Sequence, residues 1–152
     1  MAILMATWGM AFAHGGKHKS ADTGTGASYT RDILPVFENN CASCHGSKSP
    51  EHAVFMKNSD EYSSKFVGPR MDNYTLMSSF VVWPDTGSLM RNLDDGTNTE
   101  NGKPGKMYVH LGGDEQERMM NLKLFKSWVA RWTLKDWSDI TKEEMGRITL
   151  AP

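Results

Sequence analysis

Short apolar stretches at helical spacing recur along this chain, and no segment indicates a sheet. The first stretch contains Ile33, Leu34 and Phe37. Pro35 is compatible with a helix there only if it lies in the first turn, because its ring blocks the hydrogen bond of an interior position. We therefore expect a short helix that leads directly to Cys41.

The middle of the chain alternates between polar and apolar stretches. Residues 46–70 are rich in Gly, Ser, Pro, Lys and Glu with few apolar anchors, which predicts a loop with at most one helical turn. Residues 74–83 end at Pro84, and residues 88–93 follow as a second apolar stretch, so we expect two short helices. Residues 94–106 contain no apolar side chain and predict a surface loop.

The clearest helix follows Gly113. Asp114 is suited to the N-cap and Glu117 to the third helical position, a pair typical of a helix start. One apolar stripe at helical spacing is expected to pack against the helix that precedes Cys41; its members are Leu122, Phe125, Val129 and Trp132. A tail follows, in which Thr141 and Glu144 predict one more short helix by the same capping logic.

These elements predict an all-α, single-domain protein. The chain has 152 residues, of which 39% are hydrophobic, enough for one core around a small-molecule-sized pocket. Lys and Arg number 17 against 18 Asp and Glu. This balance leaves no net basic charge for nucleic acid, so we expect no nucleic-acid partner.

The N-terminus resembles an export signal. Residues 2–13 carry no charge and end in Ala11-Phe-Ala13, a small-x-small pattern typical of a cleavage site. The stretch is shorter than the roughly 20 apolar residues of a membrane-spanning helix. We expect a signal peptide at 1–13, a Gly/Ser-rich flexible leader at 14–28, and no transmembrane segment in the mature chain. Because a positively charged start is missing, a start site further upstream or a buried N-terminal segment remain as alternatives.

The motif Cys41-Ala-Ser-Cys44-His45 carries the chemistry. Two thiols at this spacing reach the two vinyl groups on one porphyrin edge, and the next residue places its imidazole beneath the iron. The pattern predicts one haem c, attached through Cys41 and Cys44 and ligated by His45. A thioredoxin-type redox pair and half of a zinc site are the competing chemistries. Haem attachment would use both cysteines of the chain.

Beyond this motif, residues 29–133 resemble the class I cytochromes c. The shared features are a short helix before Cys41, a Gly-Pro pair in the following loop, a late Met after a Gly/Pro-rich loop, and a closing helix with Trp. The resemblance implies a mono-haem, all-α cytochrome domain at 29–152, with a C-terminal extension beyond the family pattern.

The resemblance also implies two further site residues. Gly68-Pro69-Arg-Met71 is similar to the family element whose Pro carbonyl accepts a hydrogen bond from the proximal His, the orientation that metal-bound imidazoles need. Met107 has the place of the family's axial Met. Met71 and His110 remain alternatives for the sixth ligand.

Taken together, these features predict single-electron transfer by haem iron with His/Met ligation rather than an enzyme activity. The expected role is a periplasmic or otherwise exported electron carrier, or the electron-entry subunit of an oxidoreductase. Its partners would be redox proteins, including a membrane-associated redox complex. The alternative is a gas-binding or sensing protein whose sixth position is open or labile.

Overall fold

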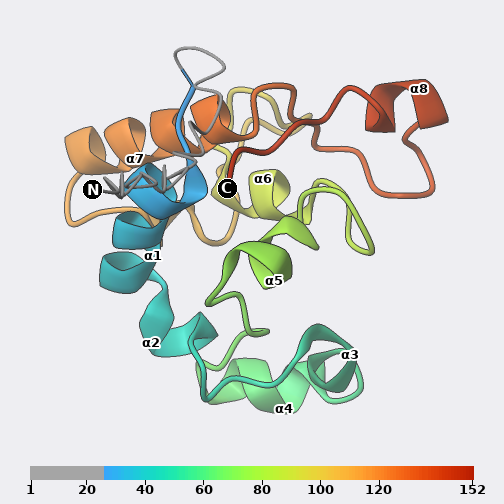
Figure 1. Ribbon diagram of the computed structural model, residues 1–152. Coiled ribbons are helices and arrows are strands. Elements are labelled where there is room, and N and C mark those ends of the chain that lie inside the picture. The colour runs from blue at the N-terminus through green and yellow to red at the C-terminus, as the bar shows by residue number, and fades with distance from the viewer. Residues whose placement is uncertain (1–25) are drawn as a thin grey trace, which may run out of the picture.

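The computed structural model describes residues 26–152 and contains, over this range, helices and loops without a strand (Figure 1). This confirms the all-α prediction. The expected signal peptide and residues 14–25 of the expected leader lie outside the described residues. Between residues 26 and 152, no helix has the length and apolar character needed to cross a bilayer.

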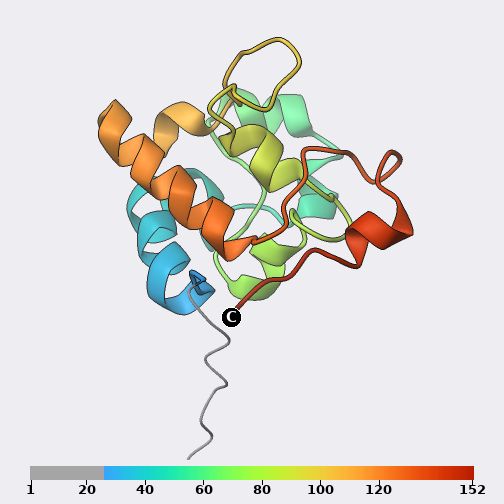
Figure 2. The same cartoon turned by 90° about the horizontal axis from the view of Figure 1, so that it is seen from above.

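Ten helical elements follow one another in the described part of the chain. They are η1 (Tyr29–Ile33), α1 (Leu34–Asn40), α2 (Ala42–His45), α3 (His52–Phe55), α4 (Ser59–Ser64), α5 (Tyr74–Ser78), α6 (Ser88–Leu93), η2 (Tyr108–His110), α7 (Glu115–Trp128) and α8 (Lys142–Met145). In Figure 1, α7 lies beside η1 and α1 at one end of the molecule, α3 and α4 lie at the opposite end, and α5 lies between. Both views place the C-terminus beside η1 (Figures 1 and 2).

The first helix begins at Tyr29, and the two residues before it are also ordered parts of the domain. Ala27 is buried, and the Ser28 side chain caps η1 by accepting from the Arg31 amide. These two residues, which we assigned to the flexible leader, therefore belong to the folded domain. The π-helical turn of η1 runs into α1, where Pro35 lies in the first turn as predicted.

The start of α7 also matches its sequence signals. The Asp114 carboxylate accepts from the Glu117 amide at 2.8 Å and so satisfies one of the free N–H groups of the first turn. The Glu117 carboxylate in turn accepts a hydrogen bond of 2.7 Å from the amide of Gly113, the residue before the N-cap. These two hydrogen bonds fix the backbone at the junction between the preceding loop and α7.

The buried face of α7 differs from the expected stripe at its last member. Leu122, Phe125 and the C-cap residue Val129 are buried as predicted, and α7 contacts η1. The helix ends at Trp128, which is 1% exposed and occupies the last position of the buried face. Trp132 lies beyond the helix end and is half-buried, with the Lys126 ammonium 5.3 Å from its ring centroid.

The C-terminal extension is bound to the rest of the domain. The Ala151 carbonyl accepts from the Trp128 indole N–H at 2.7 Å and from the Tyr29 amide at 2.9 Å. The Arg91 guanidinium contacts the Asp136 carboxylate at 2.7 Å. The predicted capping box at Thr141 is present at the start of α8. The extension is thus an integral part of the fold.

The prediction of at most one helical turn within residues 46–70 is wrong. Two short helices, α3 and α4, occupy this segment, and neither has a buried residue. The acidic pair Asp60 and Glu61 stabilises the first turn of α4, and Lys65 pairs with Glu61 at 2.6 Å. Because these helices bury no apolar stripe, the hydrophobic pattern could not indicate them.

Truncating Phe125 to Ala should lower the free energy of unfolding by about 3–5 kcal/mol, because the ring is 1% exposed and its removal leaves a cavity in the seam between α7 and η1. Urea denaturation measures the loss. Met119→Ala, on the same helix but 59% exposed, is the matched control and should change the free energy little. Equal stabilities for the two variants would refute the placement of Phe125.

Candidate haem site

One turn of backbone places the motif side chains. The Cys41 amide donates to the Phe37 carbonyl at 2.8 Å, so α1 positions Cys41 directly. The Cys41 carbonyl then accepts from the amides of Cys44 and His45 at 3.1 and 2.9 Å. Residues three apart in such a turn share one face, which brings the two thiols together. Both thiols are free and half-buried.

The Cys41 thiol lacks the electrostatics of a redox-active nucleophile. Burial, with a smaller contribution from Cys44, raises the pKa of Cys41 to about 11. A catalytic dithiol needs the opposite shift, because the thiolate is the attacking species. A zinc site would need two more ligands, and no group of three or more His, Cys, Asp or Glu side chains suited to a metal gathers within residues 26–152. The raised pKa of Cys41 therefore disfavours a redox-active pair.

The His45 ring is oriented by the chain itself. Its Nδ1 lies 2.7 Å from the Pro69 carbonyl oxygen, the contact expected from the Gly-Pro element. A carbonyl can only accept, so this contact assigns the proton to Nδ1 and leaves the lone pair of Nε2 for a metal. Burial lowers the pKa of His45 against the opposing effect of the Pro69 hydrogen bond, and the neutral form is the one that ligates iron.

Residues 68–71, which we call the strap, run alongside the haem motif and are hydrogen-bonded to it. The Gly68 amide donates to the Cys44 carbonyl at 2.8 Å, and the Met71 amide donates to the His45 carbonyl at 2.9 Å. A Cβ atom at position 68 would lie 2.1 Å from Cε1 of His45, so only glycine permits this approach of backbone to ring. The sequence pattern pointed to Pro69; the structure adds Gly68 as the residue that makes room for the imidazole.

The segment around Met107 is anchored on both sides. The Met107 amide donates to the Asn92 carbonyl at 2.9 Å, and its half-buried side chain packs against the core. Tyr108 is buried, and its hydroxyl lies 2.5 Å from the Glu115 carboxylate. His110 is exposed, and its positive charge contributes less than burial does to lowering the pKa of His45.

Met71, and three other Met and His side chains that could in principle bind iron, have other contacts in the fold. Met71 belongs to the strap that holds Nδ1 of His45, so its backbone lies on the proximal side. His52 packs edge-on against Phe80, with its Nε2 3.9 Å from a carboxylate oxygen of Asp85. Met77 and Met90, each 1% exposed, are core residues.

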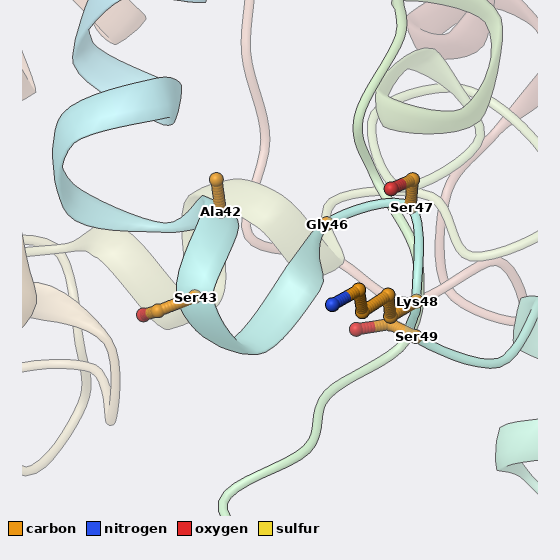
Figure 3. A pocket seen from close by; sticks show the side chains of 6 residues that line it. All are labelled: Ala42, Ser43, Gly46, Ser47, Lys48 and Ser49. Carbon is orange, nitrogen blue, oxygen red and sulfur yellow. The ribbon is translucent and has the colours of Figure 1, made fainter.

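A separate hollow of about 310 Å³ lies on the outer side of α2. Figure 3 shows the Lys48 and Ser49 side chains turned back toward α2 across it. Its lining consists of Ala42, Ser43, Gly46, Ser47, Lys48 and Ser49. Neither motif cysteine nor His45 belongs to this lining, so the hollow is distinct from the face that carries the thiols.

The site residues fit a covalently attached haem. Two free thiols share one face, the following imidazole offers Nε2, and glycine at position 68 leaves room for the ring that the Pro69 carbonyl orients. The sequence matches the family described as PccH Cytochrome c over residues 28–151. The chain belongs to the PccH cytochrome c family. Membership implies a covalent haem c, electron transfer by that haem, and redox partner proteins.

A solved structure supports this assignment. The monoheme cytochrome PccH from Geobacter sulfurreducens is 46% identical in sequence, with a TM-score of 0.78. The alignment covers 84% of this chain and 100% of that one. No curated protein matches the chain in sequence. This structural match and the helical architecture of residues 26–152 confirm the all-α, cytochrome c-like fold class predicted from the sequence.

Replacing either Cys41 or Cys44 by Ala should leave at most one thioether, because these are the chain's two cysteines. Extraction with acidified acetone should release no haem from the wild-type protein. Ser43→Ala, an exposed position between the two thiols, should retain haem as the wild type does. Free haem in the wild-type extract would exclude covalent attachment.

Proposed function

We propose that this protein carries single electrons outside the cytoplasm through a haem c with His45 and Met107 as axial ligands. When bound, the haem supplies a one-electron couple between ferric and ferrous iron. The observation that carries the proposal is the 2.7 Å contact between Nδ1 of His45 and the Pro69 carbonyl, which prepares Nε2 as the proximal ligand.

In this proposal, the protein fixes the backbone segments that carry the two axial ligands. Backbone hydrogen bonds fix the strap along Cys44 and His45, and a further one fixes Met107 to Asn92. Because each ligand is held by the chain, gain or loss of an electron requires little rearrangement. With both axial positions taken by protein ligands, the iron would have no open position for a substrate or a gas.

Met107 is the sixth ligand in this proposal. Its half-buried thioether packs against the core, whereas Met71 belongs to the proximal strap and His110 is exposed. A thioether is soft and neutral, so it stabilises ferrous iron relative to a second imidazole. His110 remains the runner-up because it lies in the same segment.

Export rests on the uncharged N-terminal stretch that ends at Ala13 and on the haem attachment itself. The mature protein would start at His14, which the mass of the purified holoprotein tests directly. In that compartment the protein would exchange electrons with redox proteins, either as a free carrier or as the electron-entry subunit of an oxidoreductase. A membrane-associated redox complex is one such partner.

A spectroelectrochemical titration of the purified holoprotein tests the proposed role. We expect one reversible, one-electron transition between two six-coordinate low-spin states, without binding of carbon monoxide to the ferrous form. A five-coordinate ferrous iron that binds carbon monoxide readily would instead favour the gas-binding function.

A further inference from the structure

A carboxylate is buried at the start of the loop that leads to Met107. Asp94 is the C-cap residue of α6 and is 0% exposed, although the sequence pattern assigned it to a polar surface loop. Burying a carboxylate is costly unless hydrogen bonds satisfy both of its oxygens. The hydrogen-bond donors to Asp94 therefore indicate the structural role of this buried carboxylate.

Within residues 26–152, the hydrogen bonds to the Asp94 side chain come from its own loop. Its Oδ1 accepts from the amides of Gly96 and Asn98 at 2.8 and 3.2 Å. Its Oδ2 accepts from the side-chain amide of Asn98 at 2.7 Å. One carboxylate thus fixes the first turn of the loop through three hydrogen bonds.

The same residue closes the loop. The Asp94 carbonyl accepts from the Gly105 amide at 2.8 Å, and two residues later the Met107 amide donates to Asn92 at 2.9 Å. A Cβ atom at position 105 would lie 2.3 Å from the Arg91 carbonyl oxygen, so the returning chain packs directly against the end of α6. The two ends of the loop therefore meet beside the C-terminal end of α6, and Met107 comes directly after the returning end.

We propose that Asp94 is a positioning residue for Met107: its buried carboxylate holds residues 94–106 in the one shape that presents the thioether to the iron. The inference rests on the proposed ligation by His45 and Met107. Without the carboxylate the loop gains conformational freedom, and this freedom must be lost again each time Met107 binds. Asp94 therefore lengthens the time that Met107 stays bound without touching the iron.

The test compares the holoproteins of Asp94→Ala and of a matched control. In Asp94→Ala, hydrogen exchange at the amides of Gly96 and Asn98 should accelerate. The near-infrared sulfur-to-iron band of the ferric protein should weaken, and carbon monoxide should bind the ferrous protein at least about tenfold faster, because several charged hydrogen bonds are lost. Glu100→Gln removes an exposed negative charge from the same loop and should change none of these quantities.

A reciprocal exchange separates positioning from general destabilisation. In Asp94→Asn the side-chain amide faces that of Asn98, so two donors meet. The double variant Asp94→Asn with Asn98→Asp restores a donor and an acceptor, and it should recover the band and slow carbon monoxide binding again. If Asp94→Ala does not fold, Asn98→Ala removes the Oδ2 contact, together with the exposed hydrogen bond from Asn98 to the Thr97 hydroxyl, and should act in the same direction.

The outcomes distinguish this inference from the proposed function. A wild-type protein with the band, together with Asp94 and Asn98 variants that keep wild-type spectra and carbon monoxide rates, overturns the role of Asp94 alone. A wild-type protein without the band overturns ligation by Met107, and the role of Asp94 falls with it.

Discussion

Replacing Gly68 by Ala should displace the proximal imidazole. A Cβ atom at this position would lie 2.1, 2.5 and 2.7 Å from Cε1, Nδ1 and Nε2 of His45. The ring must therefore move, and the 2.7 Å contact with the Pro69 carbonyl is lost with it. Overpacking of this kind costs about 1–3 kcal/mol of stability. Electron paramagnetic resonance of the ferric protein should show a shift from low-spin toward high-spin iron.

A glycine outside the site provides the control. A Cβ atom at Gly146 in the tail would come no closer than 3.5 Å to its nearest neighbour, so Gly146→Ala should keep the wild-type spin state. Low-spin iron in Gly68→Ala, with wild-type stability, would show that the strap does not press on the imidazole.

Replacing Met107 by Ala should have the larger effect on function. Loss of a soft, neutral ligand that favours ferrous iron should lower the reduction potential and leave a position that water or carbon monoxide can fill. Potentiometric titration and carbon monoxide binding to the ferrous protein measure the two consequences. Met107 is half-buried and packs against the core, so a modest loss of stability should accompany them.

Met71→Ala is the matched control, because it removes the other candidate thioether. Its amide donates to the His45 carbonyl on the proximal side, a backbone contact that the substitution leaves in place. The potential of Met71→Ala should therefore stay near the wild-type value. A large drop in Met71→Ala, with little change in Met107→Ala, would reverse the assignment of the sixth ligand.

Local signals in the sequence predicted the parts of the structure that depend on near neighbours. The helix starts at Asp114 and Thr141 follow from capping between residues three apart, and the turn at Cys41 from the motif spacing. The Gly-Pro element also indicated the contact between Pro69 and His45, since the resemblance supplied a pairing across a long separation in sequence.

Features decided by distant packing could not be predicted in this way. The apolar stripe of α7 fitted Trp132, and the hydrogen bond from Trp128 to Ala151 lies outside any local pattern. Asp94 reads as one more polar residue in a polar loop, and its burial emerges only when Gly105 returns to its carbonyl. The helices α3 and α4 bury no apolar stripe, so the hydrophobic pattern did not predict them.

The near-infrared absorption of the purified ferric wild-type protein is the most direct test of the central claim, that His45 and Met107 hold the iron of an electron carrier. A bound thioether gives a weak sulfur-to-iron charge-transfer band, and the account predicts this band in the wild type and in Met71→Ala but not in Met107→Ala. A wild-type spectrum without the band, from a protein whose ferrous form binds carbon monoxide readily, would contradict it.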